Sequence, residues 1–233
     1  SMPVAKDARP IDADIGIVVQ TNLLRVNIVA YRRLLGAGLN VLCHGGESYY
    51  PYGNDPVLAA EIDALANKNG VTFSGGGIWD MSRIWAGILV AGPCTELKSL
   101  FHSSITDITG QAASKEQAMF FGPGLTLEQF AEKSKLLLPN LVPYKTIPEH
   151  VLAALGYTIA DTRVEVEPIV LDAPLESAFM ERVYPVGAVI GTRTVATIET
   201  KQGVTARCEI ELRLFRPGEV EHMFWSVDGM PRT

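Results

Sequence analysis

The chain has 233 residues, of which 47% are hydrophobic and 20% charged, which is the composition of a globular protein with a sizeable core. Its net charge is −6 and it has no basic run, so we expect no nucleic-acid partner. No apolar run reaches the roughly 18 residues of a membrane span, and we see no signal-peptide pattern. We therefore expect no membrane partner and a cytoplasmic location.

The cysteines argue against disulfides and against zinc. Cys43, Cys94 and Cys208 show no short paired spacing such as Cys-x-x-Cys. We predict no bound metal, and we interpret the three side chains as small buried hydrophobes in a reducing compartment.

Strand and helix patterns alternate over the first 92 residues. Residues 15–19 form an apolar, β-branched run, which predicts a strand covered on both faces. Residues 20–22 predict an N-cap, and apolar positions recur at helical spacing over residues 24–35. Residues 39–43 predict a second buried strand. This order is typical of a right-handed βαβ unit with a parallel sheet.

Two glycine-rich turns follow neighbouring strands. The first, after residue 43, reads His-Gly-Gly-Glu-Ser-Tyr-Tyr, and the second follows a short strand at residues 71–73 and reads Ser-Gly-Gly-Gly-Ile-Trp-Asp. In a parallel sheet both turns lie at one edge and open onto the same crevice. An acid held there among aromatic rings has its proton affinity set by its surroundings, which makes Glu47 the leading catalytic candidate. The alternative is a surface glutamate on an ordinary loop.

Between these turns, Asp55-Pro56 predicts the N-cap and first residue of a helix that ends at Asn69-Gly70. After the second turn we expect a helix that continues to about Ala91.

Beyond residue 92 the pattern changes to long strands with a few helices, and we place a domain boundary there. A capping box at Thr126 predicts a helix that ends before Pro139. Apolar and polar residues alternate from Val204 to Leu214, so one face of that strand is predicted to be core. Gln202-Gly203 and Pro217-Gly218 predict hairpin turns on either side of it. The predicted strands are 97–109, 157–171, 186–200, 204–215 and 219–227, with a further helix at 147–155.

Several segments together resemble one family. They are Asp-Ile-Gly-Ile-Val-Val-Gln-Thr-Asn at residues 14–22, the Glu-x-x-Tyr-Pro of residues 47–51, residues 55–66, the Gly-x-Gly-x-x-Asp of residues 75–80, and residues 148–156. In this order they resemble the dihydrodipicolinate-reductase-like dehydrogenases, and within them the 2,4-diaminopentanoate dehydrogenases and native amine dehydrogenases.

The resemblance implies an NAD(P)-dependent oxidoreductase that interconverts an amine with a ketone or aldehyde plus ammonia by hydride transfer. The predicted fold class is α/β: a partial Rossmann-like parallel sheet followed by an α+β domain with a mostly antiparallel sheet. Residues 1–92 are expected to be the C-terminal half of a nucleotide-binding domain. Residues 93–233 are expected to bind the substrate and to form a homodimer.

The resemblance also assigns site residues. Glu47 corresponds to the glutamate that handles ammonia. Thr21 and Asn22 are predicted to contact the cofactor, and their alternative role is a helix N-cap. The other predicted cofactor contacts are His44, Gly45, Gly46 and Gly76, and the predicted substrate pocket is Tyr49, Tyr50, Trp79, Asp80 and His102. Each of these side chains also has a structural alternative. His44 is then an ordinary loop histidine, the tyrosines and Trp79 serve only in packing, and Asp80 is an acid in the first turn of a helix.

The sequence departs from the family at its phosphate-binding motif. Gly-x-Gly-x-x-Gly after a strand is absent, and Gly75-Gly76-Gly77 lacks that spacing. We interpret two parts of the family's fold as absent: the first half of the Rossmann domain, and a segment that in the family follows a Trp-x-x-x-Gly motif like that of Trp225 to Gly229. The choice between NAD and NADP stays open, because the residue that distinguishes them belongs to the missing half. A truncated, catalytically silent dimeric module is the alternative function. An imine reductase like dihydrodipicolinate reductase is disfavoured, because no His-His-Arg/Lys cluster is present.

Overall fold

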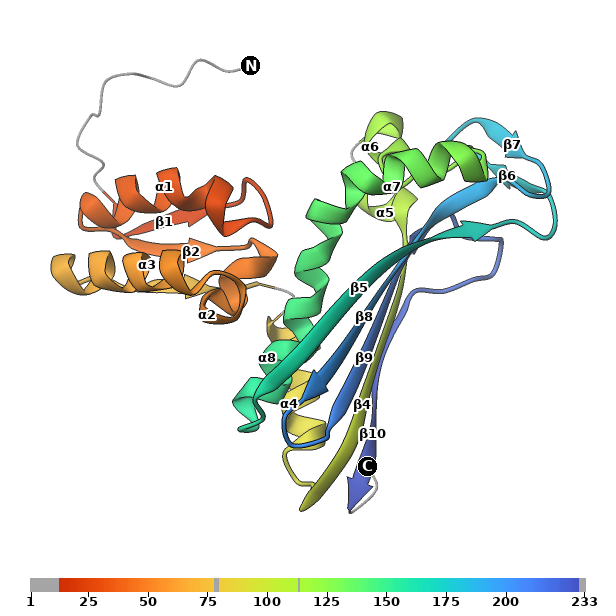
Figure 1. The fold of residues 1–233 in the computed structure, drawn as a ribbon. Coiled ribbons are helices and arrows are strands. Elements are labelled where there is room, and N and C mark those ends of the chain that lie inside the picture. The colour runs from red at the N-terminus through yellow and green to blue at the C-terminus, as the bar shows by residue number, and fades with distance from the viewer. Residues whose placement is uncertain (1–12, 78–79, 113, 231–233) are drawn as a thin grey trace. The chain divides into compact units, whose positions relative to one another are not determined.

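The computed structural model describes residues 13–77, 80–112 and 114–230. Internal contacts divide the chain into a first unit, Ser1–Asp80, and a second unit, Met81–Thr233 (Figure 1). No helix among the residues described is both long and apolar enough to cross a lipid bilayer.

The division between the units falls earlier than the boundary predicted near residue 92. The reason is helix α4 (Ala86–Ala91), which packs within the second unit. A Cβ atom added at Gly87 of this helix would lie 2.8 Å from side-chain atoms of Trp225 and Val151, so the contact leaves no space. The roles predicted for the two domains stay predictions.

The first unit is a three-stranded parallel sheet with two main helices, as the βαβ pattern predicts. Asp55 caps the second helix by accepting a hydrogen bond from the Leu58 N–H at 3.0 Å, and Gly70 ends it in a left-handed conformation (φ 65°). Two short helices between residues 46 and 54 were not predicted. The elements are β1 (Ile15–Val18), α1 (Leu24–Gly36), β2 (Asn40–Cys43), η1 (Gly46–Tyr49), α2 (Pro51–Asn54), α3 (Pro56–Asn69) and β3 (Phe73–Gly75).

Helices α1 and α3 pack on each other and on one face of this sheet. Val18, Val41 and Cys43 point from the strands into that core. Ile17 and Leu42 alternate with them and are exposed on the other face. The prediction of a first strand covered on both faces is therefore wrong for the residues described, because both helices lie on the same side.

The second unit is built on a five-stranded sheet in the order β10-β4-β9-β8-β5. All its strand pairs are antiparallel except β4 with β9, which is parallel. The predicted alternation on β9 is confirmed, since Ala206, Cys208, Ile210 and Leu212 are buried. The strands are β4 (Glu96–Asp107), β5 (Ile159–Val170), β8 (Val189–Thr200), β9 (Thr205–Arg213) and β10 (His222–Met230).

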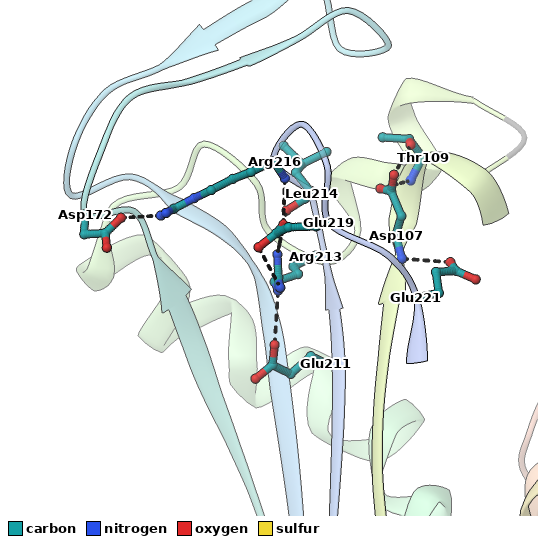
Figure 2. A network of polar contacts seen from close by, with 9 residues as sticks. All are labelled: Asp107, Thr109, Asp172, Glu211, Arg213, Leu214, Arg216, Glu219 and Glu221. Atoms are coloured by element: carbon teal, nitrogen blue, oxygen red, sulfur yellow. Dashed lines mark hydrogen bonds and ion pairs between the residues drawn. The ribbon is translucent and has the colours of Figure 1, made fainter. Parts of the chain in front are cut away.

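The predicted hairpin at Pro217-Gly218 is wrong. β9 and β10 do not pair, because β4 lies between them. The connecting loop is fixed by a network of polar contacts (Figure 2). Arg213 forms ion pairs with Glu211 at 3.1 Å and with Glu219 at 2.6 Å, and the Arg216 guanidinium pairs with Asp172. The loop is thus held across the end of the sheet.

Helices α4, α8 and α7 lie along one face of this sheet (Figure 1). The capping box at Thr126 is confirmed, but the helix it starts continues through Pro139, which removes only one donor from the last turn. A small hairpin of β6 (Leu175–Ser177) and β7 (Arg182–Tyr184) was not predicted. The helical elements are a π-helix (Asp80–Trp85), α4, α5 (Ile108–Gln111), α6 (Lys115–Met119), α7 (Leu127–Leu141), η3 (Val142–Lys145) and α8 (Thr146–Ala154).

Candidate active site

Glu47 lies in the loop that follows β2, inside the short helix η1. Its N–H donates to the Asn22 carbonyl oxygen at 3.0 Å, and its Oε2 accepts a hydrogen bond from the Leu24 N–H at 2.7 Å. Gly45 allows this approach, because a Cβ atom there would lie 2.5 Å from the Thr21 carbonyl oxygen. The loop after β2 is therefore bound tightly to the turn between β1 and α1.

The Glu47 carboxylate caps α1, which corrects the N-cap predicted at residues 20–22. Leu23 holds the N-cap position and offers no side-chain acceptor. The first N–H groups of a helix lack partners within the helix, and its N-terminus favours negative charge. A carboxylate from a different strand end supplies both the acceptor and the charge.

Thr21 and Asn22 use their side chains to hold this loop. Asn22 Oδ1 accepts from the Gly46 N–H at 3.1 Å. Thr21 Oγ1 accepts from the Leu23 N–H at 3.1 Å. The predicted contacts of Thr21, Asn22 and Gly46 with a cofactor stay predictions, and the geometry shows a structural task for all three.

The two glycine-rich turns meet at the same edge of the sheet, as expected for parallel strands. The Gly76 N–H donates to the Cys43 carbonyl oxygen at 3.0 Å. A Cβ atom at Gly77, whose φ is 146°, would lie 2.2 Å from His44 Nδ1. His44 is exposed, and its Nδ1 lies 3.3 Å from the Tyr49 hydroxyl. The structure thus brings Glu47, His44 and Gly76 into one region.

The aromatic residues differ in exposure. Tyr49 is buried, Tyr50 is half-buried with its ring against Gly53, and Tyr52 is exposed. Trp79, a predicted pocket residue, lies outside the described residues, and only the backbone of Asp80 is described, at the start of the π-helix.

His102 lies in the interior of the second unit. It is fully buried, and its Nδ1 lies 3.0 Å from the Phe224 carbonyl oxygen, which makes Nδ1 the donor. Its ring packs on Trp225 at 4.6 Å between centroids. Burial and the nearby Arg83 guanidinium lower the pKa of His102 to about 4, so the imidazole is neutral at pH 7. Its predicted contact with substrate stays a prediction.

Arg83 was missed by the sequence analysis. Its guanidinium donates to Ser104 Oγ at 3.2 Å, and its carbonyl oxygen accepts from the Trp225 indole N–H at 2.8 Å. A polar residue within a helix that starts at a glycine-rich turn was the only signal that could have found it.

Asn27 was also missed, although it lies near the Glu47 loop. It occupies a core position of α1, among Leu24, Ile28 and Tyr31, and is fully buried. A buried amide at an apolar position of a helix was the available signal, since such a group needs hydrogen-bond partners.

The described residues provide no cradle for the diphosphate of a nicotinamide dinucleotide. The edge formed by the ends of β1, β2 and β3 carries Thr21, Asn22 and His44, whose contacts with the nicotinamide ribose stay predictions. A diphosphate needs free N–H groups at a helix N-terminus after a glycine-rich turn. In α1 the Leu24 N–H is already bound to Glu47, and the turn before it has no glycine.

The architecture is that of a mixed α/β protein, with a Rossmann-like parallel sheet followed by a mostly antiparallel one. No protein-family model matches the chain. It is 28% identical over 172 residues to the 2,4-diaminopentanoate dehydrogenase of Acetoanaerobium sticklandii, across 72% of this chain and 48% of that enzyme. The chain therefore spans about half the length of this relative.

Solved structures show the same fold. The amine dehydrogenase from Mycobacterium smegmatis superposes with a TM-score of 0.78 at 24% identity, over 94% of this chain and 64% of that one. The biliverdin reductase from Synechocystis sp. PCC 6803, crystallised with biliverdin and NADP+, has a TM-score of 0.53 at 13% identity, over 94% and 58%. These similarities support the group that the sequence resembles.

Proposed function

We propose that this chain carries the amine-handling part of an NAD(P)-dependent oxidoreductase, which interconverts an amine with a ketone or aldehyde plus ammonia. The observation that carries the proposal is the Glu47 carboxylate. It is half-buried at the shared edge of the glycine-rich turns, and one of its oxygens is held in place by a backbone N–H. The similarity to 2,4-diaminopentanoate dehydrogenase supports the choice of substrate class.

The two oxygens of Glu47 have different tasks in this proposal. Oε2 is fixed by Leu24, whereas Oε1 has no hydrogen-bond donor among the described residues. A fixed carboxylate with one open oxygen can accept hydrogen bonds from an ammonium or iminium and can take its proton. Its orientation needs no adjustment when the cation arrives, because the helix terminus already holds it.

The cofactor in this proposal is NAD or NADP, which supplies the hydride acceptor when bound. Thr21, Asn22, His44 and the glycines of the two turns would lie along its nicotinamide end. The diphosphate is not assigned to any described residue.

The second unit would supply the substrate pocket and a homodimer contact. The sheet face opposite α4, α7 and α8 carries Phe101 and Phe224, whose rings lie 5.7 Å apart. Among the described residues no helix covers this face (Figure 1). Light scattering after size-exclusion chromatography should give a dimer mass, and Phe224→Glu should give a monomer. A dimer that survives this change would rule out this face.

A catalytically silent dimeric module is the second candidate. It is favoured by the Leu24 N–H being occupied by Glu47 rather than free for phosphate. Titration of the protein with NADH and NADPH, followed by nucleotide fluorescence, separates the two. Saturable binding together with amine-dependent reduction of NAD+ or NADP+ supports the oxidoreductase, and neither signal from a folded protein supports the silent module.

A further inference from the structure

We propose that Asn27 is a positioning residue that sets the orientation of the Glu47 carboxylate through the turn between β1 and α1. The inference rests on the proposed function of Glu47. It assigns a specific task to a residue that does not contact Glu47 itself.

Asn27 lies on the core-facing side of α1, where the other buried side chains are apolar or aromatic. Its side chain is fully buried in the core that α1 forms, with no accessible surface. Burying an amide without hydrogen bonds costs free energy, whereas a leucine at this position would only add apolar contact. The amide is therefore costly unless its bonds are made.

Both ends of the amide are bonded to one residue. Asn27 Nδ2 donates to the Thr21 carbonyl oxygen at 2.8 Å, and Asn27 Oδ1 lies 3.2 Å from Thr21 Oγ1, which can donate to it. Nδ2 also lies 3.7 Å from Cys43 Sγ, at the end of β2. Asn27 thus fixes the main chain and the side chain of Thr21 from within the helix.

From Thr21 the contacts continue to Glu47. Thr21 Oγ1 accepts from the Leu23 N–H, and the neighbouring Asn22 accepts from the N–H groups of Gly46 and Glu47. The Leu24 N–H then donates to Glu47 Oε2. If the turn moved, the donor that orients the carboxylate would move with it.

Amide hydrogen exchange at Leu24, followed by NMR, tests this chain of contacts without any assay of activity. Asn27→Leu keeps the core filled and should accelerate exchange at Leu24 roughly tenfold or more, because the bonds that hold the turn are lost. Thr21→Val removes the Oγ1 bonds to Asn27 and Leu23 but keeps the carbonyl bond, so it should accelerate exchange at Leu24 by a smaller factor, and it serves as the second variant if Asn27→Leu does not fold. Asn40→Ala is the matched control: Asn40 bonds Thr72 and Asp14 at the opposite end of β2 and should leave exchange at Leu24 unchanged.

A double-mutant cycle on amine-dependent turnover then tests the positioning role. Asn27→Leu should lower kcat at least tenfold in the unaltered protein and should have little effect in a Glu47→Gln background, because residues that act through one group are not additive. Unchanged exchange at Leu24, or an equal loss of kcat in both backgrounds, would overturn the proposal. Absence of turnover in the unaltered protein would contradict the proposed function instead, and the exchange result would still decide whether Asn27 orders Glu47.

Discussion

The buried His102 predicts a specific loss of stability in mild acid. Its pKa is lowered from 6.5 to about 4 by burial and by the Arg83 guanidinium. In the unfolded chain the same imidazole is accessible to water and regains its ordinary affinity for protons. Between these two values the unfolded state binds a proton that the folded state does not.

The sign and size follow from this difference. Because the unfolded state binds more protons, the free energy of unfolding rises with pH between about 4 and 6.5 and falls as the solution is acidified. At roughly 1.36 kcal/mol for each pH unit, the full difference amounts to about 3 kcal/mol. About half of it, roughly 1.4 kcal/mol, is lost by pH 5.5.

Urea unfolding at pH 7.5, 5.5 and 4.5 measures the effect. His102→Asn keeps a donor near the Phe224 carbonyl oxygen and removes the titration, so its stability should fall less with acid than that of the unaltered protein. His222→Asn, at an exposed histidine on β10, is the control and should keep the original pH dependence. Parallel curves for His102→Asn and the unaltered protein would refute the reasoning.

Three further outcomes are expected. Glu47→Ala should lower the free energy of unfolding by about 1 kcal/mol through loss of the α1 cap, whereas Glu47→Gln, which keeps an oxygen acceptor for Leu24, should lower it much less; equal losses would show that the cap bond is unimportant. Asp55→Ala should also cost about 1 kcal/mol, as the cap of α3, without affecting turnover. Arg213→Gln should cost about 1 to 2 kcal/mol, because the Arg213 side chain is only 13% exposed and joins the buried Glu211, which keeps Arg193 as its other partner, to the more exposed Glu219. Arg163→Gln, at a side chain that is 65% exposed, should cost under about 1 kcal/mol; similar values for both would contradict the burial argument.

Local chemistry made part of the fold predictable. Three predictions depend on only a few neighbouring residues, and the structure confirms each of them. They are the helix start at Asp55-Pro56, the capping box at Thr126 and the buried face of β9. The parallel order of β1, β2 and β3 follows from strand and helix spacing alone.

Long-range pairing was not predictable in the same way. Pro217-Gly218 makes the same tight turn whether the flanking strands pair directly or enclose a third strand, so the insertion of β4 had no local signal. The bond between Leu24 and Glu47 joins residues 23 positions apart, and no local sequence pattern near either residue predicts it. Glu47 was found through its setting of glycines and tyrosines, and its role as a helix cap came only from the structure.

The measurement that tests the central claim most directly is amine-dependent reduction of NAD+ or NADP+ by the unaltered protein and by Glu47→Gln, with hydrogen exchange at Leu24 as the check on geometry. We expect Glu47→Gln to keep the protection of the Leu24 amide and to lose at least a hundredfold in kcat, because the amide cannot take a proton from the amine. Turnover by Glu47→Gln at the rate of the unaltered protein would contradict the account.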